Sequence, residues 1–413
     1  MVVHPEMPLR PITIDELPAL VVMVESVFLS DSHEDGLDIE RDIFEPDRSL
    51  AVFDGDEPVA SAGAYSKLLT VPGGPIPIAA VTAVAVAPTH RRRGLLTRMM
   101  RHQLDEIHEQ GGESVAALWA SEAGIYSRFG YGMANRNAQL RVSTAESALR
   151  RDVDRGTGRL RQFSAHDGLP AMAAIHEEAR SRQVGYLDRT KPWWDRRLFD
   201  PERRREGASA LRCVVHSDET GNPDGYSLFS VKSSWTTGSP GGSATIRDLV
   251  ATTPQAYAAV WGFLLELDLV RHVEWERAAA DEPLIYLVDN PRGVRQEVSD
   301  ALWVRLIDVD RAMSARRYST PVDVVLEVSD EFCPWNTGRY RLTGGPDSAD
   351  CPRTDDPAEL TMSSTTLAAA YLGGVTLASL AAGGLVTEHR RGALAAASAA
   401  LGGARQPSCP EVF

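Results

Sequence analysis

The sequence predicts an α+β protein in which mixed sheets are flanked by helices. Three observations lead to this prediction. With 413 residues, the chain is longer than one hydrophobic core usually supports. A buried strand that leads into a helix occurs at 81–104 and again at 244–267, which indicates two copies of one structural unit. Further strands and Ala-rich helices follow as a third, α/β unit. We therefore expect domains at 1–140, 141–300 and 301–413.

The first unit opens with a short strand near Leu9 and a helix that begins at a capping box, Thr13 to Glu16. An acidic segment at 31–42 has the composition of a loop. Apolar runs then predict strands, and a 3.6-residue period predicts helices. These elements are strands at 50–53, 59–69, 76–87 and 115–119, a helix at 95–109, and a short helix that begins near Glu122.

The second unit repeats this order, with strands at 160–163, 211–216, 225–232 and 244–251 and helices at 169–180 and 254–267. The third has strands at 303–306 and 322–328, a charged and turn-rich segment at 330–356, and Ala-rich helices to about Leu401. Its uncharged stretch 361–387 is long enough to span a bilayer. Glycine pairs and weak apolarity favour two short packed helices there, with a membrane span as the alternative.

The formal net charge of −14 bears on the partners. Nucleic acids and anionic membranes bind basic surfaces, so we expect neither, and cationic small molecules are favoured. The segment with Pro5, Glu6 and Pro8 lacks the features of a signal peptide, so we expect a cytoplasmic protein. The four cysteines match no zinc-binding spacing, which predicts free thiols and no metal, with a Cys333–Cys351 bridge as the alternative.

The strongest local motif is the run Arg91–Leu96, which follows the strand at 81–87 and starts a helix. A helix N-terminus offers free N–H groups and the positive end of its dipole, so a pyrophosphate can bind there beside guanidinium groups. Gly94 would let the backbone approach the phosphates closely. The alternative is a solvated turn, because short matches of this kind are common. The second unit has Thr253–Tyr257 at this place and lacks the loop.

These residues resemble the Gcn5-related N-acetyltransferases (GNAT), whose coenzyme A loop has Arg or Gln, two residues, Gly, one residue, and Gly or Ala. Arg91 and Gly94 fit that pattern, whereas Leu96 stands at its last small position. The strand at 81–87 and the segment 120–132 extend the match. Over nearly all its length the chain is similar to the Eis acetyltransferases of actinobacteria. The resemblance implies a catalytic GNAT domain, a degenerate second GNAT copy and a sterol-carrier-like C-terminal domain.

The resemblance also implies acetyl-CoA as the co-substrate. The main chain of Val84, Ala85 and Val86 would then contact the pantetheine arm and the acetyl carbonyl, because free N–H groups at a strand edge can polarise a carbonyl. The pyrophosphate would lie on the loop and first helical turn, which comprise Arg92, Arg93, Gly94, Leu95, Leu96 and Thr97. Ser121 and Glu122 would line the far side of the coenzyme channel.

By the same resemblance, Tyr126 would be the general acid that protonates the departing thiolate. A phenol with a pKa of about 10 can do so only with help from geometry and a local field, since the pKa of a thiol is about 8.5. The alternative role is a core aromatic. The base would be the C-terminal carboxylate of Phe413, whose ordinary pKa of about 3.5 would have to be raised by burial beside acids. The alternative is a frayed terminus.

Family members known for antibiotic resistance acetylate several amines of aminoglycosides, so the expected acceptor is a polycationic small molecule. Its contacts would be Asp31, Glu34, Asp35 and Glu411, unless these charges form only a solvated face. The resemblance further implies a homo-hexamer. A protein lysine or a polyamine is an alternative acceptor. A lipid-binding carrier or interaction protein is the alternative outside enzymes, but the intact loop and Tyr126 favour an enzyme.

Overall fold

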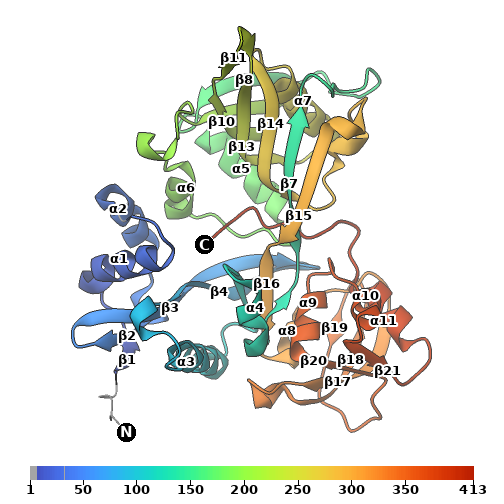
Figure 1. Ribbon diagram of the computed structural model, residues 1–413. Helices are drawn as coiled ribbons and strands as arrows, with labels where there is room; N and C mark the ends of the chain where they lie inside the picture. The colour runs from blue at the N-terminus through green and yellow to red at the C-terminus, as the bar shows by residue number, and fades with distance from the viewer. Residues whose placement is uncertain (1–6, 32) are drawn as a thin grey trace. The chain divides into compact units, whose positions relative to one another are not determined.

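The computed structural model describes residues 7–31 and 33–413 (Figure 1). The chain forms two compact units, each built from segments that are far apart in sequence. The first unit contains residues up to Asn135, then 301–404 and 412–413. The second contains 136–300 and 405–411.

The first unit holds a seven-stranded sheet with the order β1-β2-β3-β4-β5-β16-β6. Only β4 and β5 pair in parallel, and the other neighbours are antiparallel. The strands are β1 (Leu9–Pro11), β2 (Ser49–Asp54), β3 (Glu57–Val71), β4 (Gly74–Val86), β5 (Val115–Trp119), β6 (Gly132–Met133) and β16 (Leu302–Leu306). The helices are α1 (Leu17–Val27), α2 (Glu34–Ile43), α3 (Leu95–Gln110) and α4 (Ala123–Tyr126). The strands and helices predicted at 50–119 are confirmed.

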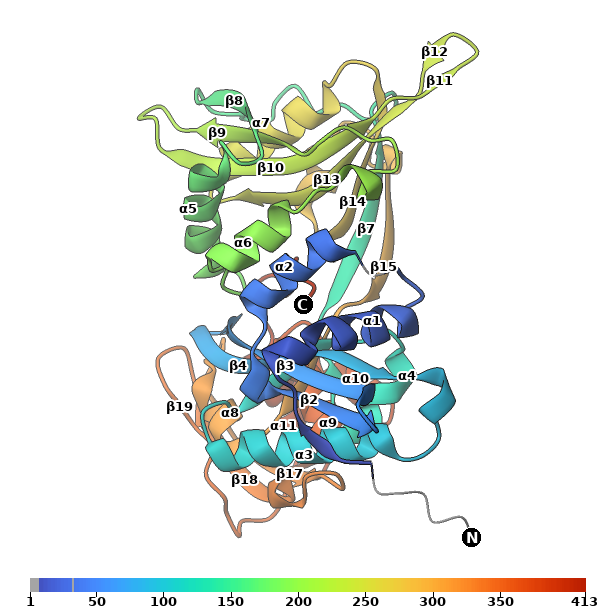
Figure 2. The same ribbon diagram turned by 90° about the vertical axis from the view of Figure 1, so that its left-hand side faces the viewer.

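Helices α1 and α3 cover opposite faces of this sheet (Figure 2). Val52 packs with Met99 of α3, whereas its neighbour Phe53 packs with Leu20 of α1. Neighbouring residues of a strand point to opposite faces, so the sheet is the middle of three layers. The long apolar strands are therefore buried on both sides.

The prediction of a loop at 31–42 is wrong for most of that segment, because Glu34–Ile43 is the helix α2. Leu37 packs against the cluster that α1 forms with β2, and Ile43 is buried. Glu34 and Asp35 stand in the first turn, where carboxylates interact favourably with the helix dipole. The acidic composition hid an amphipathic helix.

The second unit repeats the arrangement with the order β15-β7-β14-β13-β10-β9-β8. Its strands are β7 (Arg136–Ser143), β8 (Arg159–Ser164), β9 (Arg212–Ser217), β10 (Pro223–Lys232), β13 (Gly242–Ala251), β14 (Val270–Ala279) and β15 (Val294–Asp300), beside a hairpin of β11 (Trp235–Thr236) and β12 (Ser239–Pro240). Its helices are α5 (Leu169–Arg180), α6 (Lys191–Leu198) and α7 (Pro254–Leu265). The predicted elements are confirmed, while β7, β14, β15, the β11–β12 hairpin and α6 were not anticipated from the sequence.

The path of the chain exchanges strands between the two sheets. β7 follows β6 along the chain but lies beside β14 in the second sheet. β16 follows β15 but lies beside β5 in the first sheet. The strand predicted at 303–306 is confirmed, and it completes the first sheet.

The rest of the first unit forms a five-stranded sheet with the order β19-β18-β17-β20-β21, which we call the third sheet. Its strands are β17 (Val322–Ser329), β18 (Gly338–Gly344), β19 (Ala349–Asp350), β20 (Leu360–Ser363) and β21 (Val386–Glu388), with helices α8 (Val309–Ala315), α9 (Ser364–Ala370), α10 (Leu377–Ala382) and α11 (Ala393–Leu401). The turn-rich segment at 330–356 thus also contains β18 and β19. The stretch 361–387 forms the short helices α9 and α10, as predicted.

Across the described residues, no helix has both the length and the apolarity that crossing a membrane requires. All four cysteines are buried and free, so the predicted free thiols are confirmed.

Candidate active site

The first sheet opens between β4 and β5. Their parallel pairing is limited to Ala79 with Ala116 and Ala80 with Ala117. Beyond this point β4 carries a bulge, where Ala83 has a φ of +49° and the register with β3 shifts. A bulge bends its strand, so β4 diverges from β5. The opposite edge of β5 pairs with β16 along its full length, and the opening therefore lies on the β4 side.

The end of β4 presents main-chain groups to this opening. The N–H of Ala87 donates to the Val59 oxygen of β3 at 2.8 Å, and Ala85 pairs with Ser61 of the same strand. Because hydrogen-bonding direction alternates along a strand, Val84 and Val86 face the open edge. Of the three residues predicted to offer main-chain contacts, Val84 and Val86 thus direct their N–H and C=O groups to the open edge. Those of Ala85 point toward β3.

The loop after β4 leads to an uncapped helix N-terminus. Arg92 and Gly94 adopt left-handed backbone conformations, with φ of +63° and +80°. A Cβ atom on Gly94 would meet nothing within 4 Å, so the space beside it is open. In the part of the chain that the structure describes, no group accepts from the N–H of Leu95, Leu96 or Thr97. These free donors and the helix dipole form a site for an anion.

The side chains around this loop divide into two groups. Leu95 is buried and Leu96 half-buried against the ends of β3 and β4, which holds the helix in place. Arg92 and Arg93 are exposed, and Arg93 donates to the Thr89 oxygen at 3.3 Å. Their guanidinium groups can therefore turn toward phosphate oxygens. The nearby His90 is not free to turn in this way, because its ring is hydrogen-bonded to the Asp54 carboxylate at 3.1 Å.

Tyr126 ends the short helix α4, which follows β5. Its side chain is only 5% exposed, and its ring packs edge-on against Tyr131 with centroids 5.9 Å apart. Burial, and secondly the Glu122 carboxylate, raises the pKa of Tyr126 to about 12. None of the described residues is hydrogen-bonded to its hydroxyl. Tyr126 is thus both a core aromatic and a protonated donor without an acceptor among these residues. Ser121 and Glu122 are exposed at the start of the same turn.

The C-terminal segment is held along its length. Arg405 is paired with Asp281 at 2.7 Å, and the N–H of Ser408 donates to the Val184 oxygen at 2.9 Å. Residues up to Glu411 belong to the second unit, while Val412 and Phe413 group with the first unit, which contains Tyr126. Phe413 is buried, at 8% exposure.

Glu411 lies in a buried cluster of charges. Its carboxylate is paired with Arg189, which also binds Asp248 at 2.6 Å. Arg197 approaches Asp248 at 3.5 Å, so two cations balance two anions. Burial alone would raise the pKa of Glu411, but Arg189 and Arg197 outweigh it and lower that pKa. The Glu411 carboxylate, expected as a substrate contact, is therefore occupied by Arg189. Residues 189, 248 and 411 are too far apart in sequence for any local pattern to reveal this cluster.

The other three acidic residues expected at the substrate lie on the surface of the first unit. Glu34 and Asp35 share the first turn of α2, and Asp31 precedes that helix. All three are exposed. They form a small acidic surface, which is the arrangement expected of either a substrate contact or a solvated face.

The corresponding strands of the second sheet separate later, and β13 has a register shift of its own against β10. β13 and β14 pair in parallel over Gly242–Ile246, further than β4 and β5 do. The helix α7 begins with Pro254 and is capped by Thr253, whose hydroxyl accepts from the Ala256 N–H at 3.1 Å. Its N-terminus therefore has fewer free donors than that of α3.

Comparison with known proteins agrees with this geometry. Residues 8–134 and 185–306 each match the acetyltransferase (GNAT) domain family, and residues 309–410 match the sterol carrier protein domain family. An uncharacterized N-acetyltransferase of Streptomyces avermitilis is 46% identical over 373 residues, 89% of this chain and 90% of that protein. The N-acetyltransferase Eis of Mycobacterium tuberculosis is 34% identical over 384 residues, 90% of each chain.

A solved structure shows the same architecture. The crystal structure of Eis1 from Mycobacterium abscessus superposes with a TM-score of 0.85 at 33% identity, over 98% of this chain and 100% of that chain. Sequence and structure thus agree over nearly the whole length. The chain belongs to the Eis N-acetyltransferases of the GNAT superfamily, with two GNAT domains and a sterol-carrier-like domain.

Proposed function

We propose that this protein transfers acetyl from acetyl-CoA to a primary amine of a polycationic small molecule, by direct attack of the amine on the thioester. The observation that carries the proposal is the opening between β4 and β5. Three features belong to this one domain: the edge of β4 that does not pair with β5, the uncapped start of α3, and the Tyr126 hydroxyl, which has no hydrogen-bond partner among the described residues.

The residues fit the coenzyme by chemical type. Val84 and Val86 offer main-chain groups to the pantetheine amides and the acetyl carbonyl, which the N–H groups polarise. The N–H groups of Leu95, Leu96 and Thr97 bind the pyrophosphate, with Arg92 and Arg93 beside it. Gly94 keeps the approach open. Ser121 and Glu122 line the far side of the channel.

In the reaction, the amine nitrogen forms a bond to the acetyl carbon and the carbon–sulfur bond breaks. Tyr126 donates its hydroxyl proton to the leaving sulfur and regains a proton from water. With a pKa of about 12, the phenol is protonated at neutral pH but is a weaker acid than a thiol. Tyr126 therefore acts by holding a hydrogen bond to sulfur as negative charge develops, with transfer completed as the bond breaks.

The proton that the amine loses goes to the carboxylate of Phe413 and then to water. Two observations support this role for the terminus. Phe413 is buried and not frayed, and the last two residues group with the unit that contains Tyr126. The segment before them is held by Arg405 and Glu411. This proposal assigns Glu411 to holding the segment and leaves Asp31, Glu34 and Asp35 for a cationic acceptor.

An aminoglycoside is the acceptor that we put first, because the net charge of −14 and the acidic start of α2 favour a polycation. The test is thiol release from acetyl-CoA with aminoglycosides, polyamines and lysine peptides in parallel. We expect an aminoglycoside to give the highest kcat/KM. A higher value for a polyamine or a lysine peptide would overturn this choice of acceptor.

The role of Phe413 is tested in the same assay by removing that residue. We expect kcat to fall at least tenfold, with Val412→Ala as the control that alters the segment and keeps the terminal carboxylate in place. Full activity of the shortened chain would show that the base lies elsewhere. The homo-hexamer that we also propose is tested by sedimentation, in which a monomer at assay concentration would contradict it.

A further inference from the structure

The turn that carries Tyr126 rests on the sterol-carrier-like domain. After Tyr126 the chain forms a tight turn that ends at Gly130, which has a φ of +84°. The Tyr131 N–H donates to the main-chain oxygen of Tyr126 at 3.3 Å. The hydroxyl of Thr365, on α9, donates to the Ser127 oxygen of this turn at 3.3 Å. The next glycine, Gly132, has no room for a side chain, because a Cβ there would lie 2.2 Å from the main-chain oxygen of Thr365.

A buried arginine lies directly against Gly130. A Cβ at that glycine would stand only 1.7 Å from Nη1 of Arg305, so the guanidinium occupies the space that any other residue would need. Arg305 belongs to β16 and has no exposed surface. Its Nη2 donates to Asp330 at 2.5 Å and its Nη1 to Ser364 at 3.0 Å. Both partners come from the sterol-carrier-like domain.

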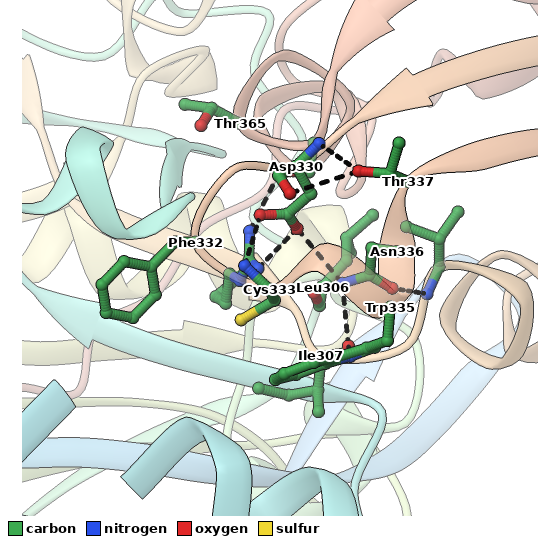
Figure 3. Close-up of polar contacts among 12 residues, drawn as sticks. Leu306, Ile307, Asp330, Phe332, Cys333, Trp335, Asn336, Thr337 and Thr365 are labelled. Atoms are coloured by element: carbon green, nitrogen blue, oxygen red, sulfur yellow. Dashed lines mark hydrogen bonds and ion pairs between the residues drawn. The ribbon is translucent and has the colours of Figure 1, made fainter. Parts of the chain in front are cut away.

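Asp330 is itself fixed by its own loop (Figure 3). Its Oδ1 accepts from the Cys333 N–H at 2.9 Å, and its Oδ2 accepts from the Asn336 amide at 3.2 Å. Its N–H donates to the Thr337 hydroxyl at 3.0 Å. The Asn336 amide also donates to the Ile307 oxygen, just after β16, at 2.9 Å. The carboxylate therefore has no freedom to follow a displaced arginine.

An aromatic contact joins the same turn and loop on another side. Phe332 of the loop packs edge-on against Phe129 of the turn, with centroids 5.0 Å apart. In Figure 3 the Phe332 ring points away from the polar contacts of Asp330. Arg101 of α3 lies over this ring, 3.8 Å from its centroid. Three separate contacts thus connect the Tyr126 turn to the sterol-carrier-like domain.

We propose that Asp330 and Arg305 are positioning residues, through which the sterol-carrier-like domain sets the place of Tyr126 for proton donation. This inference rests on the proposed role of Tyr126 as the acid. The chain of contacts runs from the loop at 330–337 through the guanidinium to Gly130, four residues after Tyr126.

The choice of a buried ion pair supports a positioning role. Such a pair adds little net stability compared with apolar residues of similar volume, because both charges must be desolvated. Here, however, Nη1 and Nη2 of Arg305 and both carboxylate oxygens of Asp330 are hydrogen-bonded, which fixes the geometry of the pair although Nε of Arg305 has no partner among the described residues. Displacing a catalytic group by about 1 Å is enough to reduce a rate about 100-fold. An arginine fixed directly against Gly130 prevents a displacement of this size in the Tyr126 turn.

The first experiment compares Asp330→Asn with Asp308→Asn in the full chain. Asp308 offers a matched control, because it is also buried and binds His108 of α3 at 2.6 Å and Arg311 at 3.0 Å. We expect Asp330→Asn to lower kcat at least tenfold with KM for acetyl-CoA unchanged within twofold. Asp308→Asn should leave both values within about twofold. Equal kcat in the two variants would overturn the proposal.

The second experiment separates positioning from general loosening by adding Tyr126→Phe to each variant. If Asp330 acts through Tyr126, Asp330→Asn costs less than about twofold in the Tyr126→Phe background. The same tenfold loss in both backgrounds would show a role unrelated to Tyr126 and would overturn the inference. If Tyr126→Phe alone retains full activity, the proposed acid is wrong, which is a different outcome.

Thr365→Val covers the case in which Asp330→Asn does not fold. It removes only the hydroxyl that binds the Ser127 oxygen and leaves the ion pair intact. We expect a loss in kcat of about threefold, the ordinary effect of one neutral hydrogen bond, and no further loss when Tyr126 is Phe. Thermal unfolding of each variant checks that the fold persists. Unchanged kcat in Thr365→Val would contradict the proposal that the sterol-carrier-like domain holds this turn in place.

Discussion

The unit β4–α3–β5 of the first GNAT domain and the unit β13–α7–β14 of the second share one connectivity and differ where the helix begins. In the first, two glycine-like conformations, at Arg92 and Gly94, lead to a helix start without a cap. In the second, Pro254 removes one N–H and the Thr253 hydroxyl binds another. The first helix start has three N–H groups without an acceptor among the described residues, whereas in the second the protein removes or binds two of the corresponding three.

The strands differ in the same sense. β4 pairs with β5 only to Ala80 before its bulge at Ala83, whereas β13 stays paired with β14 to Ile246 before a similar register shift against β10. Beyond that point, Asp248 of β13 is engaged by Arg189, which also binds Glu411. One fold thus serves two purposes. In the first domain the opening is kept free, and in the second this place holds the C-terminal segment.

The largest expected effect comes from the proposed acid. Tyr126→Phe removes the hydroxyl that we propose donates to the leaving sulfur, while its ring keeps the packing against Tyr131. We expect kcat to fall about 100-fold or more, the usual contribution of general acid catalysis. Thiol release under saturating substrates measures this.

The comparison between domains supplies the control for that variant. Tyr257 lies on α7 of the second domain, and its hydroxyl binds Glu282. Tyr257→Phe should leave kcat within about twofold. A comparable loss in both variants would mean that the second domain takes part in the chemistry.

The next effect is on coenzyme binding. Gly94→Val places a β-branched side chain at a φ of +80°, beside the free N–H groups of α3. We expect the free loop of this variant to relax out of the binding conformation, and restoring about 2 kcal/mol of backbone strain on binding corresponds to roughly 30-fold weaker binding of acetyl-CoA. Calorimetric titration measures this, and unchanged affinity would show that the phosphates bind elsewhere.

A smaller loss is expected from Arg92→Gln. Arg92 is exposed and free to reach a phosphate, and hydrogen bonds to charged groups contribute about 1.5–3 kcal/mol. We expect affinity for acetyl-CoA to fall about tenfold and to depend less on salt than in the unchanged protein. An unaltered salt dependence would show that Arg92 does not contact the phosphates.

The smallest effect belongs to the second helix start. Thr253→Ala removes the cap of α7 and should lower the free energy of unfolding by about 1 kcal/mol. Affinity for acetyl-CoA should not change, since we propose that only α3 of the first domain binds the coenzyme. Chemical denaturation and titration on one sample give both values, and weaker acetyl-CoA binding in this variant would contradict the division of roles.

The pH dependence gives a further check on Tyr126. Because burial raises its pKa to about 12, the phenol is protonated throughout the usual assay range. The phenol loses its proton only as the pH rises through this pKa, so activity should be lost only in that direction. We therefore expect no decline in kcat between about pH 8 and about pH 10. A decline centred near pH 9 would point to a different acid.

Local patterns in the sequence were enough to place most of the first domain. The apolar runs at 50–53 and 115–119 and the helix at 95–109 correspond to β2, β5 and α3. The loop from Arg91 to Gly94 could be predicted because the residues that suggest phosphate binding are adjacent in the sequence. The acidic helix α2 was missed, since charged residues outnumber the apolar ones that define its buried face.

The contacts that join distant segments could not be read from the sequence. Arg305 with Asp330, and Arg189 with Glu411, are pairs of common residue types separated by tens to hundreds of positions. Nor does any local pattern show that β16 returns to the first sheet after the chain has built the second. Such pairs depend on how the chain is threaded, which patterning within one element does not determine.

The most direct test of the difference between the two GNAT domains is the stoichiometry of acetyl-CoA binding, measured by calorimetric titration of the full chain. We expect one molecule per chain, with the binding lost or strongly weakened in Gly94→Val and kept in Thr253→Ala. Two molecules per chain, or a single one that Gly94→Val leaves untouched, would contradict the conclusion that only the first domain is open to the coenzyme.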